Sequence, residues 1–185
     1  MISILGLLGC KTDTKIVERK TDTGVEFEYK PTNATFSDFQ AIIIPTNPKN
    51  SYSRENVSKL IDCLSKQFIN KEIILYIDFS VSFDDCGQEF EKIVCPNCGK
   101  EIELDFWHEL MEKSSANDFS DLTIQTNCCN TSTDLNSLKY IADCGFAKSR
   151  IIVSDPETRK INENELLVDI KNICGFDSKI IKTHY

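Results

Sequence analysis

Hydrophobic and polar residues alternate in the N-terminal third of the chain in a way typical of β-strands. Val25, Phe27 and Tyr29 fall on one face of the segment GVEFEYK, and FQAIIIP is a short β-branched run closed by Pro45. The preceding residues, 11–24, are rich in Lys, Thr and Asp, so we predict a loop or flexible lead-in there.

The period then becomes that of a helix. Ser53 is a candidate N-cap, and we predict a helix from about Arg54 to Phe68, followed by a strand in KEIILYIDF. The apolar residues at helical spacing are Val57, Leu60, Ile61, Leu64 and Phe68.

The C-terminal end repeats this strand, helix and strand, with Gly175 where the helix should end. Apolar residues of the two units match at one constant offset: Leu60, Ile61, Leu64, Phe68, Ile74 and Leu75 correspond to Leu166, Leu167, Ile170, Cys174, Ile180 and Ile181. We therefore predict an α+β fold with two βαβ units in one antiparallel or mixed sheet, the ferredoxin-like arrangement.

The long middle of the chain then becomes an insertion between the second and third core strands. We divide the chain into a lead-in (1–24), a first αβ half (25–83), a zinc-ribbon-like insertion (84–145) and a second αβ half (146–185). A chain of 185 residues is long enough for one domain with a proper core and a small insertion.

The insertion contains half of a metal site in KIVCPNCGKEIEL. Cys95 and Cys98 have the spacing of a zinc knuckle, in which Pro96 stiffens the turn and Gly99 suits the backbone after the second cysteine. Structural Zn²⁺ takes four ligands, so two more are needed.

We predict that Cys128 and Cys129 in QTNCCNTST supply them. Adjacent side chains on a strand point to opposite faces, so both can bind one ion only if the backbone turns between them, which Asn127 and Asn130 allow. Whether both bind, or His108 replaces one, stays open. His108 lies on a predicted helix that Asp105 can cap and that buries Trp107, Leu110 and Met111.

Four thiolates leave no open position on zinc, so we expect a structural Zn²⁺ site and no catalytic residues. The chain also lacks a glycine-rich phosphate loop, Gly-x-Ser-x-Gly and His-Glu-x-x-His. The alternative is a zinc-dependent hydrolase in which Cys95, Cys98 and Cys129 bind zinc with a water, and Glu101 or His108 is the base.

A formal net charge of −8 argues against nucleic-acid binding, which depends on neutralising phosphates. We expect instead a binding protein whose partner is another, basic protein, for example an immunity or antitoxin-like protein that neutralises a basic effector. No apolar stretch is long enough for a transmembrane helix.

The nine cysteines are odd in number, and a metal site favours a reducing, cytoplasmic compartment. The alternative is a lipoprotein anchored at Cys10, because Leu7-Leu8-Gly9-Cys10 looks like a lipobox. Three other cysteines each precede a glycine: Cys86, Cys144 and Cys174. They could form a second metal or redox site, or each could be a small buried residue before a turn.

From residue 83 to the end, the chain resembles a family of uncharacterised bacterial zinc-ribbon proteins. The resemblance rests on CPNCG, the tryptophan of a following helix, NCCN, the segment LNSLKY and the strand GFA. Asn130 stands where that family tends to have glycine. The resemblance implies zinc binding in a compact bacterial protein and no particular activity.

Overall fold

The computed structural model describes residues 16–154 and 162–184. This part of the chain is an α+β structure with a six-stranded antiparallel sheet, two smaller sheets and the helices α1 (Val57–Gln67), α2 (Leu104–Ser115) and α3 (Glu163–Cys174). None of these helices is long and apolar enough to span a membrane. The predicted lipidation site, Cys10, lies outside the described residues.

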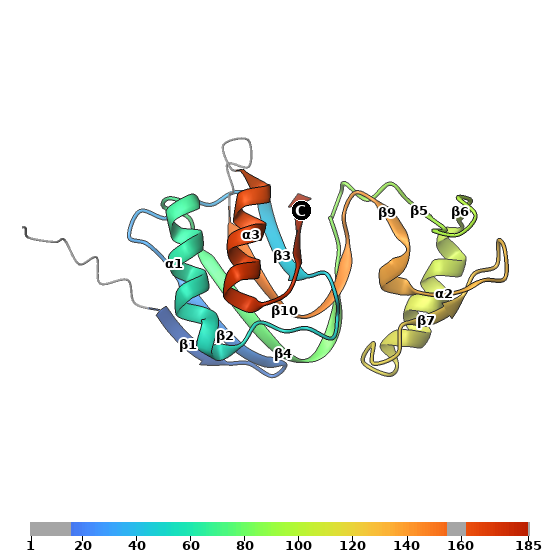
Figure 1. Ribbon diagram of the computed structural model, residues 1–185, viewed down its shortest axis with the longest axis horizontal. Coiled ribbons are helices and arrows are strands. Elements are labelled where there is room, and N and C mark those ends of the chain that lie inside the picture. Colours follow the sequence, from blue (N-terminus) through green and yellow to red (C-terminus); the bar gives the residue numbers. More distant parts are fainter. Residues whose placement is uncertain (1–15, 155–161, 185) are drawn as a thin grey trace, which may run out of the picture.

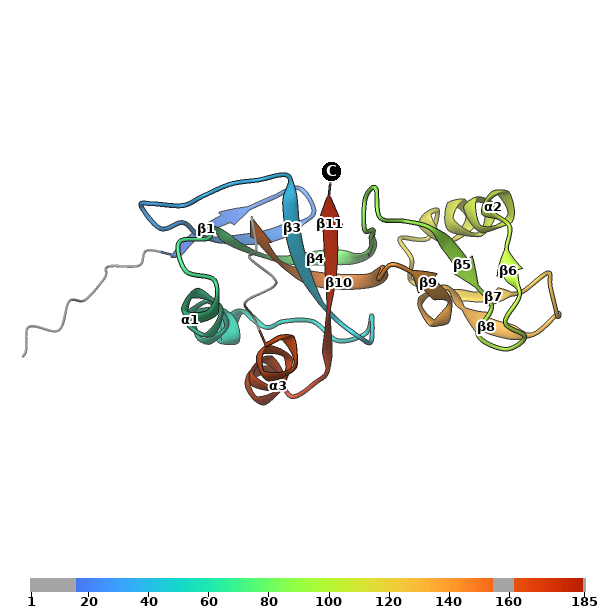
Figure 2. The same ribbon diagram turned by 90° about the horizontal axis from the view of Figure 1, so that it is seen from above.

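The six-stranded sheet has the order β1-β2-β4-β10-β3-β11, and each neighbouring pair is antiparallel. Figures 1 and 2 show α1 and α3 side by side on one face of this sheet. Along the chain, α1 lies between β3 and β4, and α3 lies between β10 and β11. The strands are β1 (Ile16–Lys20), β2 (Gly24–Tyr29), β3 (Phe39–Pro45), β4 (Ile73–Asp84), β10 (Gly145–Ser154) and β11 (Ser178–His184).

The predicted loop over residues 11–24 is wrong for Ile16–Lys20, which form the edge strand β1. The polar composition of this strand resembles that of a loop, because an edge strand tolerates charged residues on its exposed face. Arg19 pairs across the strands with Glu26 at 2.8 Å and Glu28 at 2.5 Å.

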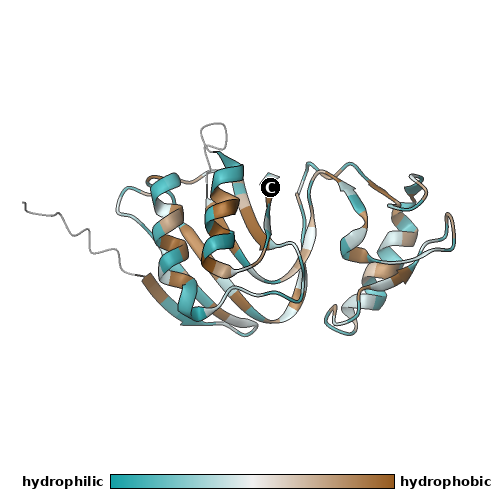
Figure 3. Ribbon diagram, viewed as in Figure 1, coloured by the Kyte–Doolittle hydropathy of each residue, from teal (hydrophilic) through white to brown (hydrophobic). Residues whose placement is uncertain are grey.

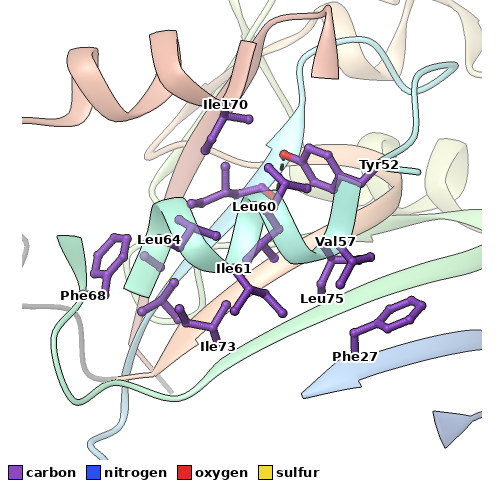
Figure 4. Packing of buried hydrophobic residues seen from close by; sticks show 14 of the residues in the cluster. Phe27, Tyr52, Val57, Leu60, Ile61, Leu64, Phe68, Ile73, Leu75 and Ile170 are labelled. Carbon is purple, nitrogen blue, oxygen red and sulfur yellow. Dashed lines mark hydrogen bonds between the residues drawn. The ribbon is translucent and has the colours of Figure 1, made fainter. Parts of the chain in front are cut away.

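The main core lies between the sheet and the two helices. The five apolar residues predicted for the first helix are all buried, and Figure 4 shows them in one cluster with Ile73 and Leu75 of β4 and Ile170 of α3. Figure 3 shows apolar residues alternating with polar ones around both helices. Tyr52 is buried beside this core, and its backbone N–H donates to Ser149 Oγ at 2.7 Å.

The helix ends match the sequence in part. Ser53 makes no side-chain capping bond, because it precedes a 3₁₀ turn (Arg54–Asn56) and α1 begins only at Val57. At the other helix, Gly175 adopts the left-handed conformation at φ 82°, as predicted, and ends α3.

The offset that relates the two units holds in the helices and fails in the last strands. Leu60 and Leu166 are both fully buried in the main core. In the strands, Leu75 faces the helices whereas its counterpart Ile181 packs on the opposite face of the sheet. A one-residue slip reverses the faces of a strand, so Ile180 is the residue that corresponds to Leu75 in packing.

The segment between β4 and β10 has its own small elements and its own core, at the far end of the long β4–β10 ribbon (Figure 1). Besides α2 it contains β5 (Lys92–Val94), β6 (Glu101–Ile102), β7 (Thr123–Gln125), β8 (Ser132–Asp134), a 3₁₀ turn (Leu135–Ser137) and β9 (Lys139–Ile141). Its buried residues are Ile93, Cys95, Ile102, Trp107, Ile124, Leu135, Leu138 and Phe146.

Asn136, in the segment LNSLKY, joins this part to the sheet. Its side-chain N–H donates to Thr46 O at 3.1 Å, and its side-chain oxygen accepts from Phe146 N at 3.2 Å. Tyr140 of the same segment donates to Leu135 O at 2.9 Å and accepts from Trp107 Nε1 at 3.3 Å. The segment thus connects the two cores through specific hydrogen bonds.

Candidate metal centre

The first half of the candidate centre is a tight turn between β5 and β6. Cys95 N donates to Lys100 O at 2.8 Å, and Gly99 N donates to Cys95 O at 3.0 Å. Gly99 has φ 73°, a conformation that favours glycine. These bonds fold Cys95 and Cys98 onto the same side of the turn, as the zinc-knuckle spacing predicts.

The second half, between β7 and β8, repeats the same backbone hydrogen bonds. Thr126 N donates to Thr131 O at 3.1 Å, and Asn130 N donates to Thr126 O at 2.9 Å. The two turns therefore align with Thr126 at the place of Cys95 and Cys129 at the place of Cys98.

Asn130 takes the place of Gly99, and its φ of 53° is left-handed like that of the glycine. Asparagine is among the few residues that adopt this conformation readily. The backbone does turn between Cys128 and Cys129, so the adjacent cysteines can face one point.

The four predicted cysteines come together. The sulfur atoms of Cys95, Cys98, Cys128 and Cys129 all lie within 4.8 Å of one another. The Cys95–Cys129 sulfurs are 3.7 Å apart and the Cys98–Cys128 sulfurs are 3.4 Å apart. A tetrahedral ion with metal–sulfur bonds of about 2.3 Å requires sulfurs about 3.8 Å apart. The donor set therefore fits one thiophilic metal ion.

Two threonine hydroxyls contact the sulfur of Cys129, which the sequence analysis did not predict. Thr126 Oγ1 and Thr131 Oγ1 each lie 3.3 Å from Cys129 Sγ. These hydrogen bonds, that of Thr126 first, lower the pKa of the Cys129 thiol to about 6. Aligning the two knuckles in the sequence would have identified Thr126, because it occupies a ligand position of the first turn.

The other thiols respond to their own surroundings. A hydrogen bond with the backbone of Cys98 is the largest effect that lowers the pKa of Cys95. Loss of solvent around its sulfur and a hydrogen bond with Cys98 raise the pKa of Cys128 to about 12. A metal ion that binds all four as thiolates must therefore displace protons, and Cys128 resists ionisation more than Cys95 or Cys129 does.

His108 does not belong to the cluster. It is exposed on α2, where its ring lies beside that of Trp107 with centroids 5.1 Å apart. Trp107 is buried and Leu110 and Met111 pack beside it, as predicted. Asp105 is not the cap of α2, because the helix begins at Leu104 with Glu103 at the N-cap.

Two of the three cysteines that precede glycines also meet. Cys86 and Cys144 are buried with their sulfurs 3.4 Å apart, whereas Cys174 lies half-buried at the end of α3. Gly87 and Gly175 have positive φ, as expected of turn glycines.

The centre is thus assembled from two hairpin turns that each present two sulfurs to one point. Closed sites of this kind hold small folds together, because metal binding in such a site adds directly to folding free energy.

Comparison of the chain with known protein families, curated proteins and solved structures gives no match.

Proposed function

We propose that the chain is a zinc-stabilised, acidic protein-binding domain. The observation that carries the metal part is the convergence of four sulfur atoms within 4.8 Å. A set of four thiolates suits Zn²⁺ and leaves no position for water or substrate, so zinc would act as a structural ion.

We further propose that the two knuckles form a zinc ribbon inserted in a ferredoxin-like sheet. The strand order β4-β10-β3-β11, with both helices on one face, supports this interpretation. Membership of the bacterial zinc-ribbon family remains an inference from the shared residues of CPNCG, NCCN and LNSLKY.

The binding role is supported by a groove of about 1000 Å³ at the junction of the sheet and the inserted part. Phe79 lines it and, at 72%, has the largest exposed fraction among the large apolar side chains of the described residues. Its charged lining residues are Lys49, Asp118, Asp121, Asp134 and Lys148, so carboxylates outnumber ammonium groups. A groove with one more carboxylate than ammonium groups and an exposed aromatic residue suits a basic segment of a partner protein.

The test is affinity capture from an extract of the source organism at low salt, with zinc-loaded protein. The variant Asp118→Asn/Asp121→Asn removes two groove charges, and Asp169→Asn, on the exposed side of α3, is the control for a single lost charge. We expect a basic protein that wild type and control retain, and that the double variant and high salt release. Capture that is the same for all three proteins would contradict the proposal.

The hydrolase alternative requires one thiol to stay away from the ion. In the structure Cys128 lies 3.4 Å from Cys98, among the other sulfurs, and the candidate base His108 is exposed outside the cluster. The geometry therefore favours a closed site.

A further inference from the structure

We propose that Cys86 and Cys144 form a second thiol site, separate from the candidate metal centre, and that its chemistry is disulfide formation. Their sulfur atoms are 3.4 Å apart although 58 positions separate the residues in the chain. Both side chains are buried, with exposed fractions of 0% and 1%. Two thiols in contact inside a core are a potential cross-link.

The pair lies at the base of the inserted part. Asp84 and Gly145 are the last paired residues of β4 and β10 on that side. Cys86 lies two positions after Asp84, where the chain leaves the sheet, and Cys144 lies directly before Gly145, where the chain returns. A bond between them would join the two ends of the insertion and restrict the unfolded chain by closing a long loop.

The surroundings favour a disulfide over a second metal ion. The carboxylate of Asp85 accepts a hydrogen bond from Gly87 N at 2.7 Å. The ammonium group of Lys179 donates to Cys144 O, so a positive charge already lies beside the pair and disfavours a cation. Within the described ranges, the metal-ligating residues that gather in a group of three or more are the four cysteines of the candidate centre.

The core around the pair is apolar, and a disulfide suits it better than a thiolate. Its buried members are Ile42, Ile44, Ala147 and Ile181. Burial raises the pKa of both thiols, so in the folded, reduced protein the pair is neutral and reacts slowly. A disulfide removes two S–H groups from this core and adds no charge.

The oxidant that the reaction needs is a low-molecular-weight disulfide. One cysteine, as thiolate, attacks that disulfide, forms a mixed disulfide and releases one small thiolate. The second cysteine then attacks the protein sulfur of the mixed disulfide and releases the other. Overall, two protein thiols lose two electrons and two protons, and the small disulfide is reduced to two thiols. Because neither sulfur is exposed, thiol–disulfide exchange takes place during folding or when the end of the β4–β10 pair of strands opens.

The test is peptide mapping of zinc-saturated protein refolded in equal concentrations of reduced and oxidised glutathione and then alkylated. Trypsin produces the peptides 72–92 and 140–148, each with one cysteine of the pair. We expect the linked pair of peptides as the main product, and its loss after treatment with a reductant.

Variants keep this test specific. Cys144→Ser should leave peptide 72–92 alkylated at Cys86, whereas Cys63→Ser, a half-buried cysteine on α1, should leave the link unchanged. In urea, Trp107 fluorescence should show a higher unfolding midpoint for the oxidised wild type than for its reduced form, and no such difference for Cys144→Ser. Recovery of both wild-type peptides in alkylated form, or mainly linked to other cysteines, would overturn the proposal. This site does not depend on the metal proposed above, so either proposal can fail alone.

Discussion

The hydroxyl of Thr126 lies 3.3 Å from Cys129 Sγ and occupies, in the second knuckle, the place that Cys95 has in the first. The two turns share their backbone hydrogen bonds but not the positions of their cysteines. The fourth sulfur of the cluster comes from Cys128, which lies between Asn127 and Cys129 in the sequence. Thr126 therefore has the position of Cys95 in the first turn, but its hydroxyl contacts the sulfur of Cys129 instead.

This equivalence predicts that a ligand can be moved within the second knuckle. Cys128→Ala should weaken zinc binding, because the remaining three thiolates leave the tetrahedral site incomplete. Adding Thr126→Cys should recover most of the affinity, since it restores the Cys-x-x-Cys pattern of the first turn. Competition with a chromogenic chelator measures both variants. A double variant no better than Cys128→Ala would refute the equivalence of the two turns.

The hydroxyl itself should matter even though it is not a ligand. Thr126→Val keeps the side-chain shape and removes the hydrogen bonds of Oγ1 with Cys129 Sγ and with the backbone of Thr131. We expect metal affinity to fall by ~10–100-fold, the usual effect of losing an outer-sphere partner. Thr133→Val, in β8 of the same hairpin, is the matched control and should bind zinc as wild type does. Equal affinities for the two variants would count against a role for Thr126.

Removal of the metal should unfold the inserted part and leave the sheet intact. Trp107, the one tryptophan of the chain, lies in the core of the insertion, so its fluorescence reports on that part alone. After chelation we expect its emission to shift to longer wavelength and amide exchange to accelerate in β5, β6 and β7. Amides of α1 and β3 should keep their protection, because their core is separate. Uniform acceleration across both parts would show that they unfold together.

A buried ionic group predicts a particular dependence of stability on pH. Arg150 donates to Asp84 at 2.8 Å and to Asp78 at 3.1 Å, while the second carboxylate oxygen of Asp84 is buried without a hydrogen-bond partner in the described part of the chain. Burial outweighs the guanidinium and raises the pKa of Asp84 to about 6.

The sign follows from proton binding. An unfolded Asp releases its proton near pH ~4, so between about pH 4 and 6 the folded state binds a proton that the unfolded state has lost. The free energy of unfolding should therefore fall as pH rises through this window, by about 2–3 kcal/mol from this residue. Urea denaturation of wild type and Asp84→Asn at several pH values isolates the effect, since thiol titration is common to both. Parallel pH profiles would contradict this prediction.

Local patterns predicted the two helices of the main core, the second helix end and the four clustered cysteines, because periodicity, a turn glycine and ligand spacing are local signals. The edge strand β1 was missed because its residues are charged and its pairing with β2 is a tertiary property. The correspondence of Ile181 with Leu75 failed for a similar reason, since strand register is set by the whole sheet.

Contacts between distant segments were beyond local patterns as well. That Cys86 meets Cys144 depends on the pairing of β4 with β10, and that Asn136 bonds Thr46 depends on how the insertion docks. Thr126 was recoverable from the sequence, but only by aligning one knuckle with the other.

Zinc K-edge X-ray absorption on the protein loaded with one equivalent of zinc tests the central claim most directly. Four sulfur neighbours at about 2.3 Å are predicted, with no nitrogen or oxygen in the first coordination sphere. A sphere of three or fewer sulfurs completed by lighter atoms, or zinc that the protein does not retain, would contradict the closed four-cysteine centre.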